Sequence, residues 1–268
     1  MMPLVRLPSS ETFYVEEGSG MPLVLVHGMG GDHTVWDSQL PGFRDRFRII
    51  RPDILGHGQS EKPAGPWKFT QFSRQIAELL EHLRIPRAIV CGFSLGGSIG
   101  QAVAMDYPDR VAALVIVSSG CARTPEEQAA IEARVAQVRE GGPPAVVNGA
   151  MKRWFSEKFS NENPALIEYW RLRLLGNAYE PYCAVYRLYA DIDRQLLDRL
   201  GEIKAPTLIV TGDKDPGQTP RMANEMARRI PDSEVHIFPG VPHMLPLEAA
   251  PELDRLVKDF VARRVPVT

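Results

Sequence analysis

The amino-acid sequence predicts an α/β fold with a mostly parallel central sheet, helices on both faces and a helical insertion. Two features indicate the sheet: short, continuously apolar runs, and segments with helical periodicity that alternate with them. Such strands are typical of parallel sheets that are buried on both faces. The third feature is a break in the alternation between about Cys121 and Lys204, where no convincing strand pattern occurs.

Each element follows from its local pattern. Continuous apolar runs predict strands at residues 23–27, 47–51, 88–91, 112–118, 207–211 and 234–238. Apolar residues spaced by three and four predict helices that include residues 76–83 and 253–260. Between them, residues 98–105 predict a helix that stops near Pro108.

The segment that breaks the alternation is rich in aromatic and arginine side chains and is interrupted by Gly141-Gly142-Pro143-Pro144. We interpret it as a helical cap over the sheet. The predicted organisation is therefore an α/β core in two parts, residues 1–120 and 205–268, with the cap at 121–204 between them.

Composition narrows the class of protein. A net charge of −2 gives no reason to expect nucleic acid or an acidic membrane surface as a partner. No apolar run approaches the roughly 20 residues of a membrane helix, and the first 20 residues contain no secretory h-region. The three cysteines form no CxxC pair, which favours a reduced, cytoplasmic protein. The oligomeric state stays open.

The sequence GFSLGG at residues 92–97 is the strongest functional signal. It lies between a predicted strand and a predicted helix, which is the context of a nucleophile elbow. The turn is tight, so glycines are expected at Gly92 and Gly96, and the Ser94 hydroxyl would stand at the strand end. The alternative is a glycine-rich turn of structural importance only.

A serine hydroxyl needs a base, and the base needs an orienting acid. His243 is the expected base, because it lies in a loop between the last predicted strand and the last predicted helix. Asp213 and Asp215 both follow the strand at 207–211, and Asp215 lies further out in the loop. By position, the backbone amides of Met29 and Leu95 would supply the oxyanion hole.

The sequences HGMGG, DILGHGQSEKP, GFSLGG, GDKDPGQTP and GVPHM occur in the order and spacing of the α/β-hydrolase superfamily. The chain resembles this superfamily everywhere except in the cap, and within it the 3-oxoadipate enol-lactonase group and its carboxylesterase relatives. The resemblance implies an α/β-hydrolase fold, and the GDxD pattern implies that Asp215 is the acid.

These residues predict a cofactor-free serine hydrolase that cleaves a carboxylic ester or lactone through an acyl-enzyme, and the resemblance implies an enol-lactone as a candidate substrate. The alternatives are C–C bond hydrolysis or perhydrolase chemistry on the same triad, and a non-catalytic ligand-binding protein. A metal site is not expected, because HExxH and HxH motifs are absent. Cap side chains expected to contact the substrate are Trp154, Phe155, Tyr182 and Tyr186, and the cap arginines that could bind a substrate carboxylate are Arg153, Arg171, Arg173 and Arg187.

Overall fold

The structure is a computed structural model that describes residues 4–265, which contain an eight-stranded sheet in the order β1-β2-β4-β3-β5-β6-β7-β8. Strand β2 pairs antiparallel with β1 and with β4, and every other neighbouring pair is parallel. The strands are β1 Leu4–Arg6, β2 Glu11–Glu17, β3 Met21–Val26, β4 Phe47–Pro52, β5 Ala88–Phe93, β6 Val111–Val117, β7 Thr207–Gly212 and β8 Ser233–Phe238.

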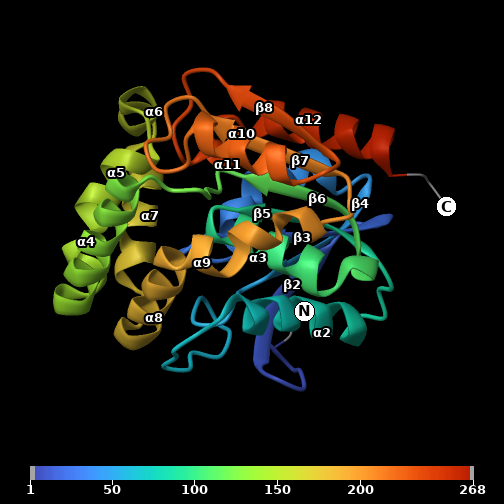
Figure 1. Ribbon diagram of the computed structural model, residues 1–268, viewed down its shortest axis with the longest axis horizontal. Helices are drawn as coiled ribbons and strands as arrows, with labels where there is room; N and C mark the ends of the chain where they lie inside the picture. The colour runs from blue at the N-terminus through green and yellow to red at the C-terminus, as the bar shows by residue number, and fades with distance from the viewer. Residues whose placement is uncertain (1–3, 266–268) are drawn as a thin grey trace.

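Helices cover both faces of this sheet and form the segment between β6 and β7 (Figure 1). The helices that belong to the α/β core are α1 Leu40–Phe43, α2 Phe69–His82, α3 Leu95–Asp106, α10 Pro220–Arg229, α11 Leu245–Glu248 and α12 Ala250–Arg264. Those between β6 and β7 are α4 Pro125–Gly141, α5 Val147–Trp154, α6 Glu157–Glu162, α7 Pro164–Leu175, α8 Tyr179–Ala190 and α9 Ile192–Leu196.

The two faces of the sheet form two separate hydrophobic cores. Successive side chains of a strand point to opposite faces, so Val24 and Val90 pack on the side of α2, α3 and α10. Leu25 and Cys91, one position later, pack on the opposite side with α12. Because both faces are covered, the central strands β3, β5, β6 and β7 are almost entirely apolar, which is why they were recognisable in the sequence.

The predicted mostly parallel sheet with helices on both faces is confirmed, and each of the six predicted strands exists within one or two residues of its expected bounds. Strands β1 and β2 were not predicted. β2 carries Glu11, Glu16 and Glu17, and its pairing with β4 does not require a continuous apolar run. Its neighbour β1 has only three residues.

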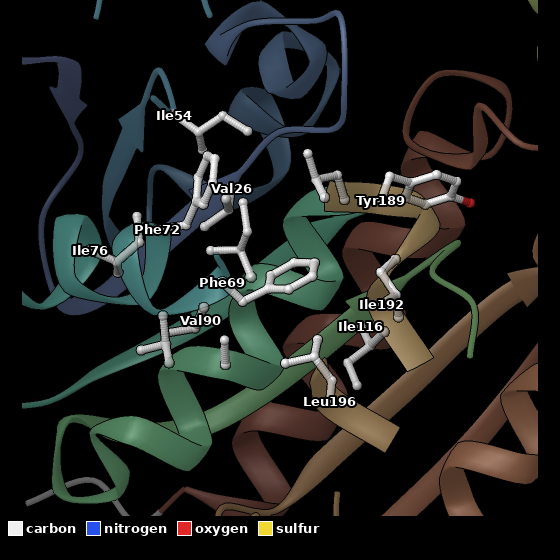
Figure 2. Close-up of a cluster of buried hydrophobic side chains, with 14 of the residues drawn as sticks. Val26, Ile54, Phe69, Phe72, Ile76, Val90, Ile116, Tyr189, Ile192 and Leu196 are labelled. Atoms are coloured by element: carbon white, nitrogen blue, oxygen red, sulfur yellow. The ribbon is translucent and has the colours of Figure 1, made fainter. Parts of the chain in front are cut away.

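Residues 121–204 form helices and their connections. Helices α4 to α8 are grouped together at one end of the molecule (Figure 1). The last part of the segment joins the core: Ile192 and Leu196 of α9 belong to the cluster that contains Val26, Phe69 and Val90 (Figure 2).

Candidate active site

Ser94 lies at a tight turn between β5 and α3. Its backbone has φ 54° and ψ −118°, a conformation that is energetically costly for any residue other than glycine. A Cβ atom on Gly92 would overlap the carbonyl oxygen of Gly96, and a Cβ on Gly96 would overlap that of Val26. Both glycines are therefore required by close backbone approach, and the turn directs the serine hydroxyl into a cavity.

The structure brings Ser94, His243 and Asp215 into one hydrogen-bonded row. The His243 Nε2 atom lies 3.2 Å from Ser94 Oγ, and His243 Nδ1 lies 2.7 Å from Asp215 Oδ2. The Asp215 and His243 side chains are nearly inaccessible. The other carboxylate oxygen, Asp215 Oδ1, accepts hydrogen bonds from the backbone amides of Gly217 and Gln218, each 2.9 Å long. These bonds fix the carboxylate while it orients the imidazole.

Asp213, the other aspartate after β7, has a different partner. Its Oδ1 accepts a hydrogen bond of 2.7 Å from the backbone amide of Gly240, in the turn that leads to His243. The side chain is partly exposed, and it lies beside Lys214 at 3.8 Å. The Asp213 carboxylate thus connects two loops without touching the imidazole.

The loop after β3 lies directly beside Ser94. A Cβ on Gly28 would come within 3.0 Å of Ser94 Cβ, so this position also requires a close approach of the backbone. Met29 lines the cavity, and Leu95 begins α3. Within residues 4–265 neither backbone amide donates a hydrogen bond to another protein atom.

The His27 side chain makes two hydrogen bonds that fix the start of this loop. Its Nε2 accepts a hydrogen bond from the amide of Ile54, so the proton is on Nδ1, which donates to the carbonyl oxygen of Gly28 at 2.8 Å. Burial lowers the pKa of His27, with Asp53 opposing the shift, and the ring is neutral. Sequence reasoning did not predict this support, because a histidine at a strand end has no distinctive pattern.

The glycine-rich loop at 53–60 packs against this support: the Ile54 amide donates to His27, and the His57 ring lies 5.3 Å from the His27 ring. Burial works against ionisation of Asp53, but hydrogen bonds from His33 and Gln59 lower the pKa of its carboxyl to about 2. Burial lowers the pKa of His57 to about 3.

Cap side chains complete the cavity above Ser94. Of the four predicted contacts, Trp154, Tyr182 and Tyr186 line it, while Phe155 does not. Phe155 follows the end of α5 in extended backbone, which turns its side chain away to stack on Phe159, with ring centroids 5.8 Å apart. Lining residues that sequence reasoning did not single out include Val35, Ile131, Arg134, Trp170, Tyr189 and Gln218.

Two sets of contacts connect the cap to the loops around Ser94. On α7, Arg173 forms an ion pair of 2.6 Å with Asp32, and the Asn177 side chain next to this helix donates to the carbonyl oxygen of Gly30 at 2.9 Å. On the opposite side, the amide of Met244 donates to the carbonyl oxygen of Trp154 at 2.9 Å. The Trp154 ring lies 6.2 Å from the His243 ring.

Among residues 4–265, no cluster of three or more acidic, histidine or cysteine side chains has the arrangement of a metal site. None of the described helices combines the length and apolar character of a membrane span.

The sequence profile described as alpha/beta hydrolase fold matches residues 21–250, and the chain belongs to this family. It is 34% identical over 197 residues to 3-oxoadipate enol-lactonase 2 of Acinetobacter baylyi, covering 74% of this chain and 72% of the relative. It is also 27% identical to (E)-2-((N-methylformamido)methylene)succinate hydrolase of Acinetobacter baylyi, covering 92% and 93% of the two chains. The crystal structure of the enol-lactonase from Burkholderia xenovorans LB400 superposes with a TM-score of 0.90 at 26% identity, over 97% of this chain and all of that one.

Proposed function

We propose that this protein hydrolyses a carboxylic ester or lactone through an acyl-enzyme on Ser94. The observation that carries the proposal is the row of hydrogen bonds from Ser94 through His243 to Asp215, which lies at the wall of a cavity. This cavity measures about 100 Å³, which suits a small substrate. Similarity to an enol-lactonase supports the choice of a lactone as the first substrate class to test.

The proposed reaction uses each of these groups in turn. Ser94 Oγ forms a bond to the carbonyl carbon and passes its proton to His243 Nε2, while the carbonyl oxygen becomes an oxyanion held by the amides of Met29 and Leu95. Asp215 stabilises the resulting imidazolium. The intermediate collapses, the C–O bond breaks, and the leaving oxygen takes the proton from His243.

Water then completes the cycle. His243 removes a proton from the water, the oxygen attacks the acyl carbon, and Ser94 leaves with its proton restored. With a lactone, the leaving oxygen stays attached to the acyl chain, so the product is one open hydroxy acid. An enol-lactone releases an enol, which tautomerises to a ketone.

A panel of aryl esters, lactones, thioesters and a β-diketone tests the reaction class. We expect the wild-type protein to hydrolyse esters or lactones, and Ser94→Ala to lose about 10⁴-fold or more in kcat. A fluorophosphonate should add one mass increment to the peptide containing residues 92–97 of the wild type and none to Ser94→Ala. Labelling at Ser98 or Ser118 with activity retained in Ser94→Ala would contradict the proposal, and cleavage of the β-diketone alone would favour a C–C hydrolase.

A further inference from the structure

The Asp215 carboxylate is oriented by the short loop that follows it. Its Oδ1 atom accepts hydrogen bonds from the backbone amides of Gly217 and Gln218, each 2.9 Å long, and its Oδ2 atom faces His243. Gly217 has no side chain that could restrict the backbone between these residues. The position of the carboxylate therefore depends on how Gln218 is held.

The backbone of Gln218 is attached to the sheet. Its carbonyl oxygen accepts a hydrogen bond of 2.6 Å from the hydroxyl of Thr211, a buried residue of β7. The next residue, Thr219, caps the start of α10 by accepting a hydrogen bond from the amide of Met222. These contacts hold one side of the loop, while the Gln218 side chain lies on the other side, at the wall of the cavity.

This side chain crosses from the loop to the cap. The Nε2 atom of Gln218 donates a hydrogen bond to the phenol oxygen of Tyr189, in the last turn of α8. Both orientations of the Gln218 amide allow the bond, because a phenol hydroxyl can donate as well as accept. The two residues are only 6% and 8% exposed, so loss of the bond would leave a buried polar group without a partner.

Tyr189 lies on a part of the cap that is fixed to the core. Its ring packs in the same buried cluster as Ile192 of α9 (Figure 2), and the Arg123 guanidinium lies 4.7 Å from the centre of the ring. Asp193, also on α9, accepts hydrogen bonds from the backbone amides of Ala122 and Arg123, at 2.8 and 2.7 Å. Because these two amides follow β6, the end of α8 and the start of α9 are joined to the sheet.

We propose that Tyr189 is a positioning residue that fixes Asp215 by holding Gln218. Within residues 4–265, Tyr189 makes no hydrogen bond to Asp215 or His243, so its effect passes through the loop. The hydrogen bonds then run without a break from the cap through the acid to the base. This inference rests on the proposed function for its effect on rate, whereas the orientation of Asp215 can be measured without turnover.

Tyr189→Phe and Gln218→Met test the proposal, because each variant nearly keeps the size of the side chain and removes the hydrogen bond. We expect each to lower kcat about 10-fold on a small neutral ester, with KM changed by no more than about 2-fold. The double variant should lose no more than either single variant, since both changes remove the same bond. Tyr179→Phe is the control, because this phenol at the start of α8 donates to the carbonyl oxygen of Arg139 outside the cavity.

Two kinetic outcomes would overturn the proposal and leave the hydrolase function intact. One is a higher KM with unchanged kcat in Tyr189→Phe, which would place the phenol in substrate binding. The other is a double variant whose loss is the product of the two single losses, which would mean that the residues act independently. Circular dichroism verifies folding, and if one variant does not fold, the other still tests the bond.

A second measurement reports on the acid itself. The proton on His243 Nδ1, held against Asp215 Oδ2, should give a proton resonance far downfield of the backbone amides, which is identified by its loss in His243→Ala. We expect Tyr189→Phe and Gln218→Met to move this resonance upfield and broaden it, because a loosely held carboxylate makes a weaker hydrogen bond. Tyr179→Phe should leave it unchanged. A shifted resonance supports the proposal even if no ester or lactone is hydrolysed, and a resonance identical to that of the wild type in both test variants would overturn it.

Discussion

Two aspartates two positions apart illustrate how much depends on a single residue. Asp215 orients the imidazole of His243 through Oδ2, while Asp213 holds the backbone of Gly240. An imidazole that becomes cationic during the proposed reaction needs an anion at its other nitrogen, which sets both tautomer and charge. The neighbouring aspartate can stabilise only the loop.

We therefore expect Asp215→Asn to lose about 10³- to 10⁴-fold in kcat with KM little changed, because the amide presents an N–H where an acceptor is needed. Asp213→Asn should keep most of the rate and lower the melting temperature instead. Both variants are measured on one ester after circular dichroism has verified their folding. If Asp213→Asn is the inactive variant, Asp215 is not the triad acid.

Sequence order and chemistry were sufficient to propose Ser94 and His243, because each follows a recognisable strand. They left Asp213 and Asp215 as candidates for the acid, and the resemblance to the α/β hydrolases favoured Asp215. They were not sufficient for Arg134, which lies on α4 three residues after buried Ile131 and four before buried Val138. A charged residue aligned with buried ones was the available signal. Which helix faces the cavity depends on packing between the cap and core, and no local pattern carries that information.

At the scale of elements, the cap is hydrogen-bonded to a loop of the active site as well as lining the cavity. Asn177, just after α7, donates to the carbonyl oxygen of Gly30 and also to the carbonyl oxygens of Arg173 and Leu174, at 3.2 and 2.9 Å. One amide group thus joins the end of α7 to the loop that presents the Met29 amide. The orientation of that amide is therefore linked to the position of the cap.

Asn177→Ala should lower kcat about 10-fold on a small neutral ester and leave KM nearly unchanged, since an oxyanion donor acts mainly in the transition state. Asn163→Ala provides a matched control, because Asn163 makes a similar bond to the carbonyl oxygen of Phe159 within the cap. Steady-state kinetics of the two variants give the comparison. A higher KM with unchanged kcat in Asn177→Ala would place the effect on substrate binding instead.

The same scale shows why some elements were predictable. Strands that are buried on both faces are short, continuous apolar runs, so β3, β5, β6 and β7 were recognisable in the sequence. β1 and β2 extend the sheet by antiparallel pairing, and their sequences resemble polar surface segments. The helices of the cap were predictable as helices, but not the way α9 leaves the cap to pack on the core.

For the whole molecule, a buried carboxyl group couples stability to pH. Asp254 on α12 packs against Gly42 of α1, where a Cβ atom would overlap the carboxylate. One of its oxygens, Oδ1, has no hydrogen-bond partner within residues 4–265. Burial raises the pKa of Asp254 to about 7, and Lys258 opposes the shift. The folded protein therefore binds this proton more tightly than the unfolded chain, in which the pKa is near 3.8.

This difference makes the free energy of unfolding fall as the pH rises from about 4 through 7, because the unfolded chain ionises Asp254 before the folded protein does. Each unit of difference between the two pKa values corresponds to about 1.4 kcal/mol, so the total loss in the free energy of unfolding is a few kcal/mol. This total is reached above pH 7. Buried His57 has the opposite sign: its pKa of about 3 removes stability as the pH falls below about 6.5. Because the two residues affect the pH dependence of stability with opposite sign, variants are needed to measure the contribution of Asp254 alone.

Asp254→Asn keeps the shape of the side chain and removes its charge, so its free energy of unfolding relative to wild type should increase by a few kcal/mol between pH 4 and pH 8. Any constant cost of placing an amide there cancels in this difference. Asp259→Asn, on the exposed side of the same helix, serves as the control and should show no comparable trend. Urea unfolding of both variants and the wild type at several pH values measures the effect. A difference between Asp254→Asn and wild type that stays constant with pH would mean that Asp254 is ionised in the folded protein at pH 5 and above, and that water reaches its carboxylate.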